Sequence, residues 1–246
     1  MDKHYLRTLQ THFPFLHDLR FRLKLGLMGL RGRPHEPDFY FLQQFQPAAH
    51  EVLVDVGANR GESILSMRLM AGERTPIVAF EPHPLIFSKL EQRFARSPKV
   101  QLFNYGLAQQ PGEQTLYTPF YRQWMFDGLT SFDYEAARNW LPGRLWGFDP
   151  RKLSIHSTTC QTQTLDSFQL APAFIKIDVQ GYETQVLQGA RDTLRRHKPV
   201  LLIESLQDEQ KALLNPLGYQ YFHFQKRQLL PGKGALNTFC VPPNRL

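Results

Sequence analysis

The residues best placed to do chemistry lie in one short loop. Residues 55–61 read DVGANRG and stand between a β-branched apolar run and a segment with helical spacing. Gly57 allows the chain to turn tightly and lets a ligand approach the backbone. Open parallel sheets bind ligands at the carboxyl ends of their strands, where the strand order reverses. The loop is therefore a candidate cofactor site, and its candidate binding residues are Asp55, Gly57, Asn59 and Gly61.

A carboxylate follows at the end of the next predicted strand. Glu81 lies 24 residues after Gly57 and can accept hydrogen bonds from both hydroxyls of a ribose, so the pair suits an adenosine-bearing cofactor. Dinucleotide enzymes use G-x-G-x-x-G, because its backbone amides must approach a pyrophosphate. This loop lacks the second glycine of that pattern. S-adenosylmethionine has a sulfonium and an amino-acid tail instead, and it fits the polar loop better. A tight turn without any ligand is the structural alternative.

The apolar runs alternate with helical patterns along most of the chain. Such alternation predicts an α/β fold with a mostly parallel central sheet and helices on both faces. The expected strands are 52–56, 77–80, 100–103, 174–178 and 199–204, and the expected helices are 61–70, 85–94, 183–196 and 208–214. Two late strands, 219–224 and 238–241, are joined through Pro231 and Gly232 and predict an antiparallel hairpin at one edge.

Three regions differ in composition. Residues 1–50 are basic and amphipathic, and prolines 34 and 37 mark a break in them. We expect this region to be a helical arm and residues 51–246 to be one domain. Within that domain, residues 119–157 form an aromatic-rich insertion that holds all three tryptophans of the protein.

Several motifs together resemble the FkbM family of O-methyltransferases. They occur in the family's order and cover most of residues 52–205. The motifs are VDVGANRG at 54–61, AFEPHP at 79–84, TLDSF at 164–168, FIKIDVQGYETQVLQGA at 174–190 and LLIES at 201–205, with NTFCV at 237–241 similar to the family's last strand. The resemblance implies a Rossmann-like class I methyltransferase fold and S-adenosylmethionine as cofactor. It also implies methylation of a hydroxyl of a sugar, a glycan or a secondary metabolite.

One position departs from the family pattern. Many members read K-I-D-V-E-G where this chain has Gln180 in place of the glutamate. A role that needs a carboxylate at position 180 is therefore in doubt, whereas Asp178 and Glu183 remain. In class I methyltransferases the end of the third strand meets the adenine, which makes Asn104 and Tyr105 candidate cofactor contacts. Tyr105 can equally be a core aromatic.

A hydroxyl acceptor must lose its proton, so a general base is expected. Asp178 ends the fourth strand and can position the acceptor or the methionine amino group, or it can cap the next helix. Glu204 ends the fifth strand on the rim of the site and can orient the acceptor or act as a cap. His83 follows Glu81 and is a candidate base, because the free pKa of histidine is close to neutral, but a solvated residue at a helix start is the interpretation we favour.

The insertion is a candidate acceptor-binding lid. Its tryptophans can pack against sugar faces, and its interleaved arginines can hold carboxylates or phosphates. The alternative is a satellite core for a long segment, and we favour a mixture of the two. The candidate substrate-binding residues are Trp124, Arg122 and Trp140 of the insertion, together with Glu183 beyond it.

The charge of the chain is concentrated in the arm. Residues 1–33 hold seven Lys or Arg side chains against two Asp, which is most of the net charge of +7. A basic helix with an apolar side can lie on a membrane surface. The interpretation we favour is a pair of helices packed on the domain or on a second copy in a homo-oligomer.

Other function classes fit the sequence less well. A basic nucleic-acid-binding module would carry its charge on the folded body, so we expect no nucleic-acid partner. We expect the acceptor to be a small molecule or a glycan. The sequence lacks the glycine fingerprint that a nicotinamide oxidoreductase would need. No His, Cys, Asp or Glu set has metal-ligand spacing. Two distant cysteines, no long apolar run and no signal segment predict a cytoplasmic protein, peripheral to the membrane if the arm binds lipid.

Overall fold

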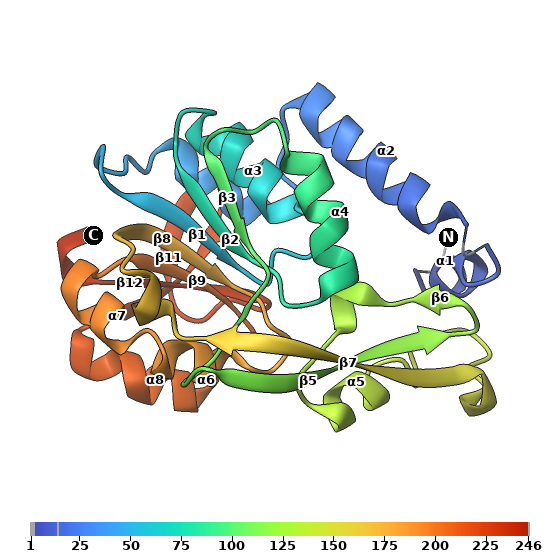
Figure 1. Ribbon diagram of the computed structural model, residues 1–246. Helices are drawn as coiled ribbons and strands as arrows, with labels where there is room; N and C mark the ends of the chain where they lie inside the picture. Colours follow the sequence, from blue (N-terminus) through green and yellow to red (C-terminus); the bar gives the residue numbers. More distant parts are fainter. Residues whose placement is uncertain (1–2, 14, 246) are drawn as a thin grey trace.

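A mixed sheet of eight strands forms the centre of the protein (Figure 1). The computed structural model describes residues 3–13 and 15–245. The strands of this sheet are β1 Val52–Val56, β2 Ile77–Phe80, β3 Val100–Phe103, β8 Pro172–Ile177, β9 Val200–Glu204, β10 Gln220–Gln225, β11 Gln228–Pro231 and β12 Asn237–Val241. Their order is β11-β10-β12-β9-β8-β1-β2-β3.

The pairing confirms the predicted Rossmann-like sheet. β3, β2, β1, β8 and β9 are neighbours in parallel, and the last three strands are antiparallel to their neighbours. The chain builds outward from β1 to β3 and then returns to place β8 on the other side of β1. The strand order therefore reverses between β1 and β8, and ligands of such sheets bind at the carboxyl ends beside that point.

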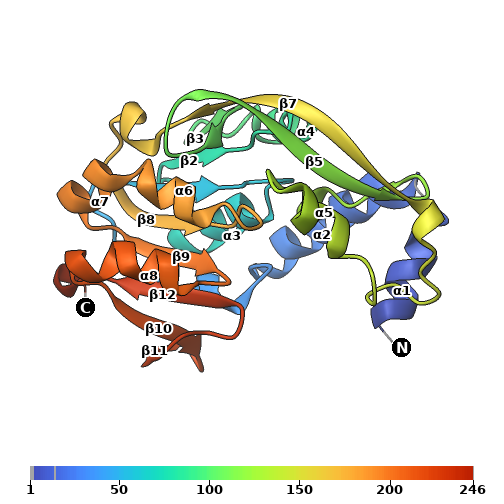
Figure 2. The ribbon, with the colours of Figure 1, turned by 90° about the horizontal axis from the view of Figure 1, so that it is seen from below.

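Helices cover both faces of the sheet (Figures 1 and 2). One face carries η1 Pro37–Gln43, α3 Glu62–Ala71 and α4 Pro84–Phe94, and the other carries α6 Glu183–Gln188, α7 Arg191–His197 and α8 Asp208–Leu214. Each face of the sheet has its own hydrophobic core. Because side chains alternate along a strand, Leu53 packs in the core beneath α3 and α4, and Val54 packs in the core beneath α6 and α7. Shorter 3-10 turns occupy η4 Leu165–Phe168, η5 Asn215–Leu217 and η6 Pro243–Arg245.

The helix predicted at 183–196 is two helices. Gly189, between α6 and α7, lies so close to a neighbouring loop that a Cβ there would be 2.0 Å from the carbonyl oxygen of Ala108. The Asp166 carboxylate accepts hydrogen bonds from the backbone N–H groups of Asp192 (3.1 Å) and Thr193 (2.8 Å). Side-chain capping of these orphan donors starts a new helix at α7. Neither contact is visible in a helical periodicity.

The late strands number three rather than two. β10 and β12 pair antiparallel, as predicted, but β12 also pairs with β9, and β11 forms the edge. A two-residue turn joins β10 to β11, and both of its residues have left-handed backbone, with φ 49° at Lys226 and 63° at Arg227. Such turns match the twist of a hairpin, and glycine or asparagine usually marks them. A Lys-Arg pair gives no such signal.

A second sheet carries the predicted insertion. β5 Gly112–Tyr121 and β7 Leu153–Gln163 pair antiparallel along their whole length, with β4 Gly106–Leu107 and β6 Trp124–Met125 at the sides. This ribbon starts before residue 119 and runs from the main sheet toward the amino-terminal arm (Figures 1 and 2). The segment between its strands also holds η2 Asp127–Leu129, α5 Tyr134–Asn139 and η3 Pro150–Lys152.

The arm consists of α1 Lys3–Gln10 and α2 Leu16–Arg31. α2 buries His17, Leu25 and Met28 against the domain. The predicted arm and domain also include residues 1, 2, 14 and 246, which lie outside the described residues. Within the described part of the chain, no helix combines the length and the apolar character that crossing a bilayer requires.

Candidate active site

The glycine turn after β1 brings two strand ends together. Gly57 has φ +84°, a region that favours glycine, and a Cβ there would be 2.0 Å from the carbonyl oxygen of Asp178 at the end of β8. A side chain is therefore excluded at position 57 both by conformation and by space. The turn places the cofactor loop directly beside the Asp178 segment, at the point where the strand order reverses.

Glu81 closes the floor of the same region. Its side chain is buried, and its carboxylate accepts hydrogen bonds from the backbone N–H groups of Asn59 (2.8 Å) and His83 (2.9 Å). Burial raises the pKa of Glu81 to about 7, against the opposing effect of those two amides. A carboxylate with these properties is fixed in direction and has free lone pairs for further hydroxyl donors.

A pocket opens between the glycine turn, Glu81 and the insertion. From the domain it is lined by Gly57, Asn59, Glu81, Tyr105, Asp178 and Gln180. From the insertion it is lined by Asp127, Gly128, Thr130 and Phe132. The amide oxygen of Asn59 is buried and has no hydrogen-bond partner among the described residues, so it can accept a bond from a bound ligand.

Three of the predicted cofactor residues lie behind this pocket. Asp55 is fully buried and accepts a hydrogen bond from the Ser63 hydroxyl at the start of α3. Gly61 packs so closely on Phe94 that its role is to seat α4. The Asn104 amide donates to the backbone oxygens of Glu81 (2.8 Å) and Pro82 (3.1 Å). These residues shape the loops that line the pocket.

A chain of polar contacts leads out of the pocket from β8 to β9. The Lys176 ammonium donates to Asp178 at 2.8 Å. The Gln180 side-chain amide donates to Asp178 at 2.8 Å and to Glu204 at 2.9 Å. Gln180 therefore bridges two carboxylates through N–H groups that a glutamate at this position would not offer. The departure from the family pattern has a structural role here.

The two carboxylates of this network differ in acidity. Burial disfavours ionisation of Asp178, but the adjacent Lys176 charge and the hydrogen bonds outweigh burial and lower its pKa. The hydrogen-bonding interaction with ionised Asp178 and burial raise the pKa of Glu204 to about 8. Neighbouring carboxylates commonly diverge in this way, because the second one ionises against the charge of the first. Glu204 is thus the group of the pair that exchanges a proton near neutral pH.

A larger cleft of about 980 Å³ lies on the other side of Gln180. Small-molecule sites typically have volumes of about 300–1,000 Å³. The cleft is lined by Trp140 and Ser131 of the insertion, by Gln180, Glu183 and Glu204 of the domain, and by Arg7 of the arm. The Glu183 carboxylate also accepts the backbone N–H groups of Val179 and Gly181, each at 3.2 Å, so it shapes the cleft wall as well.

The remaining predicted residues line neither space. Trp124 is buried and packs edge-on against His17 of α2, with ring centroids 4.5 Å apart. Arg122 lies exposed in the turn between β5 and β6. His83 stands at the start of α4, as expected, but our expectation of a solvated side chain is wrong, because only 6% of the residue is exposed. Burial lowers the pKa of His83.

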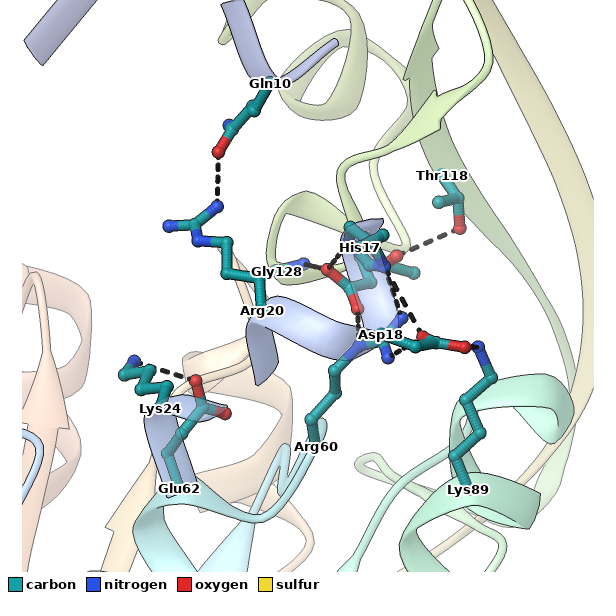
Figure 3. Close-up of polar contacts among 12 residues, drawn as sticks. Gln10, His17, Asp18, Arg20, Lys24, Arg60, Glu62, Lys89, Thr118 and Gly128 are labelled. Atoms are coloured by element: carbon teal, nitrogen blue, oxygen red, sulfur yellow. Dashed lines mark hydrogen bonds and ion pairs between the residues drawn. The ribbon is translucent and has the colours of Figure 1, made fainter. Parts of the chain in front are cut away.

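An ion-pair cluster around the buried Arg60 side chain joins the glycine loop to the arm and the insertion (Figure 3). Arg60 of the loop donates to Asp127 of the insertion and, at 2.6 Å, to Asp18 of α2. His17 lies 2.9 Å from the same guanidinium, and Lys89 of α4 donates to Asp18 at 2.8 Å. Sequence reasoning missed these partners, because no local pattern relates residues that are so far apart in the chain.

Arg7 and Asp127 are the clearest omissions from the predicted site. Asp127 lines the smaller pocket and Arg7 lines the cleft, although neither belongs to a recognisable motif. The stacking of the Arg7 guanidinium on Trp140, 5.0 Å from the ring centroid, comes from tertiary packing alone. Within residues 3–13 and 15–245, no group of three or more His, Cys, Asp or Glu side chains is arranged to hold a metal ion.

The family of this architecture is shown by sequence. The model of the methyltransferase FkbM domain matches residues 55–225, which include the glycine turn, Glu81, Asp178 and Glu204. The chain belongs to the FkbM methyltransferase family. No curated protein matches the chain in sequence at a significant level.

Solved structures agree with this fold. The chain is similar to the methyltransferase FkbM from Methylobacillus flagellatus KT, with 18% identity and a TM-score of 0.52 over 84% of this chain and 48% of that one. It thus spans about half the length of that protein. It also matches a SAM-dependent O-methyltransferase from Thermotoga maritima (9% identity, TM-score 0.42, 85% and 66% of the two chains). A third match is Aeropyrum pernix fibrillarin, with 13% identity and a TM-score of 0.41 over 83% of this chain and 76% of that one.

Proposed function

We propose that this protein transfers a methyl group from S-adenosylmethionine to a hydroxyl of a sugar, a glycan or a related polar metabolite. The observation that carries the proposal is the position of Gln180. It lines both the cofactor pocket and the large cleft, and it bridges Asp178 on one side to Glu204 on the other. Donor and acceptor would therefore meet across a single hydrogen-bonded side chain.

The residues of the smaller pocket fit an adenosyl cofactor with an amino-acid tail. Glu81 would accept the ribose hydroxyls, and Tyr105 would lie against the adenine. The unpartnered amide oxygen of Asn59 would accept from the ammonium of the tail, and the side-chain-free turn at Gly57 leaves room for close approach. When bound, S-adenosylmethionine supplies a methyl group that its sulfonium already activates.

Glu204 is the proposed general base. Its pKa of about 8 lies close to neutral pH, where proton transfer to a carboxylate is most effective. The Gln180 amide at 2.9 Å fixes the direction of the carboxylate, and Asp178 holds the amide from the opposite side. The acceptor hydroxyl would pass its proton to a carboxylate oxygen of ionised Glu204.

The two other function classes have less support. A nicotinamide oxidoreductase would need the second glycine for its pyrophosphate, and the matched family is one of methyltransferases. A nucleic-acid-binding module would need a basic folded body, whereas the excess of positive charge lies in the arm.

The first test is titration calorimetry with S-adenosylhomocysteine, followed by a screen of sugars, glycans and metabolites with a labelled methyl donor. Once an acceptor is found, Glu204→Gln should lower kcat by about 100- to 10,000-fold, the usual contribution of a general base. Its affinity for S-adenosylhomocysteine should not change. The matched control is Glu91→Gln on the exposed side of α4. If the folded protein does not bind S-adenosylhomocysteine, the proposal is rejected.

A further inference from the structure

Two arginines share one tryptophan at the arm side of the large cleft. The guanidinium carbons of Arg7 and Arg144 lie 5.0 Å and 4.3 Å from the centroid of the Trp140 ring. Arg7 comes from α1, and Arg144 and Trp140 follow α5 in the insertion. All three side chains line the cleft. The aromatic ring therefore holds two cations of different elements at one end of the candidate acceptor site.

Among the described residues, this cationic pair has no acidic partner. Across residues 3–13 and 15–245, no carboxylate lies within ion-pair distance of Arg7 or Arg144, and their identified hydrogen bonds go to the backbone oxygens of Arg144 (3.3 Å) and Trp140 (3.2 Å). Burial lowers the pKa of Arg7, and the charges of Arg144 and Arg20 lower it further. Each guanidinium keeps further N–H donors in a fork that suits an oxyanion.

The same cleft also has acidic lining residues. Glu204 of β9 and Asp208 and Glu209 of α8 line it, whereas the two arginines come from the arm and the insertion. A ligand that reaches from the base Glu204 to the two arginines must carry its hydroxyl at one end and a negative group at the other.

We infer that Arg7 and Arg144 form an oxyanion subsite and that the acceptor is a sugar or similar metabolite with a phosphate or carboxylate group. The inference rests on the proposed function, because it uses the same cleft. It adds a role for the arm: α1 completes the acceptor site that the insertion begins.

Three sugars that share a ring and differ in charge test the subsite. Glucose 6-phosphate, glucuronate and glucose are titrated into the full chain by calorimetry. We expect at least one of the two anions to bind about tenfold tighter than glucose, the order expected for one charge-assisted contact. The stronger anion identifies the group as phosphate or carboxylate.

The double variant Arg7→Gln/Arg144→Gln should lose this preference, and the exposed pair Arg74→Gln/Arg96→Gln is the matched charge control. Equal binding of the three sugars, binding of none of them, or a preference that survives in the double variant would overturn the subsite. Each protein is also titrated with S-adenosylhomocysteine. Retained affinity for that ligand separates failure of the subsite from failure of the proposed function.

A second, independent observation concerns the outer face of α2. Its inner face is fixed to the domain by the Arg60 and Lys89 contacts to Asp18 (Figure 3). Five leucines recur every three or four residues on another face, and each is at least 39% exposed. They are Leu16, Leu19, Leu23, Leu27 and Leu30. A helix with a second apolar stripe facing solvent marks an interaction surface.

Charge indicates what covers this stripe. Arg20, Arg22 and Arg31 are exposed on the same helix, whereas its Asp18 binds Arg60 and Lys89. Two copies of the helix would bring like charges together. An anionic lipid surface would receive both the leucines and the cations.

We propose that the outer face of α2 binds an anionic membrane surface. The full chain should co-sediment with vesicles of phosphatidylcholine and phosphatidylserine at low salt, and less with phosphatidylcholine alone. The triple variant Leu19→Ser/Leu23→Ser/Leu27→Ser should abolish co-sedimentation. The control Leu85→Ser, at an exposed position of α4, should not. Absence of binding at low salt would reject the proposal. The proposal would also be rejected if light scattering showed a dimer of the unmodified chain and a monomer of the triple variant, because a second copy of the chain would then cover this face.

Discussion

The parallel sheet and the arm–insertion half of this protein are held together by different contacts. At the cofactor edge of the sheet, strand ends meet through backbone: Gly57 lies against the Asp178 carbonyl, and Glu81 binds main-chain amides. The arm and the insertion are attached to that edge through side-chain charges around Arg60. Backbone contacts depend on local conformation and apolar burial, whereas the charge cluster depends on three distant segments being present at once.

The difference bears on how the site is assembled. The glycine loop is shaped by the parallel sheet, but two walls of the candidate ligand spaces come from the insertion and the arm. Asp127 and Phe132 of the insertion line the smaller pocket, and Arg7 of the arm lines the cleft. The Ser131 hydroxyl donates to the Gln180 backbone oxygen at 2.7 Å, so the insertion also touches the bridging loop. Donor binding and acceptor binding should therefore respond differently to damage in the two halves.

The largest effect is expected at the buried charge that joins the halves. Arg60→Met leaves Asp127, 6% exposed, without its arginine partner and with His17 at 3.6 Å, and loss of one member of a buried pair costs about 3–5 kcal/mol of unfolding free energy. Chemical denaturation measures this loss. Asp127→Asn in the Arg60→Met background should recover part of it. A destabilisation by Arg60→Met no larger than that of an exposed pair would show that the cluster does not couple the halves.

Gly57→Ala tests the backbone side of the comparison. We expect a rise in the dissociation constant of S-adenosylhomocysteine of about 100-fold, or roughly 3 kcal/mol, because the methyl group displaces the Asp178 carbonyl. Gly72→Ala is the control: it has a similar φ of +91° but open space around its Cβ. If both variants bind the ligand equally well, close approach at position 57 is not what shapes the pocket.

The pKa of Glu81 predicts a pH dependence confined to the cofactor side. With a pKa of about 7, Glu81 becomes protonated as the pH falls through neutrality and loses acceptor capacity for ribose hydroxyls. Affinity for S-adenosylhomocysteine should fall by about tenfold per pH unit below 7. Calorimetry at several pH values measures this slope. Glu81→Gln should bind weakly with no such slope, and an unchanged slope in that variant would assign it to another group.

The smallest effect is expected at the surface between the halves. Lys24 of α2 pairs with Glu62 of α3 at 2.8 Å, and the lysine side chain is 46% exposed (Figure 3). Exposed ion pairs contribute about 0–1 kcal/mol. Lys24→Ala should therefore shift the denaturation midpoint only slightly, and high salt should remove the shift. A loss as large as that of Arg60→Met would mean that α2 is held by its whole charged surface rather than by one buried cluster.

Most of the fold could be predicted from the sequence, and the departures have local causes. The strands β1, β2, β8 and β9 are buried, mostly apolar runs between clear breaks, and β3 is a short, partly buried one, so hydrophobic patterning locates all five. The break between α6 and α7 depends on Gly189 touching Ala108, and the β10–β11 turn uses a Lys-Arg pair. The long ribbon of β5 and β7 could not be predicted, because its strands are polar and partly exposed and their buried and exposed residues alternate irregularly.

The site divides in the same way. The sequence by itself determined the glycine turn, Glu81, Asp178 and Glu204, because each closes an apolar strand and the carboxyl ends of parallel strands meet at one edge. Only the tertiary structure decided that Gln180 bridges two carboxylates, that Trp124 packs on the arm, and that Arg7 joins Arg144 over Trp140. Those contacts join residues from separate elements, and their distances are fixed by packing rather than by any pattern along the chain.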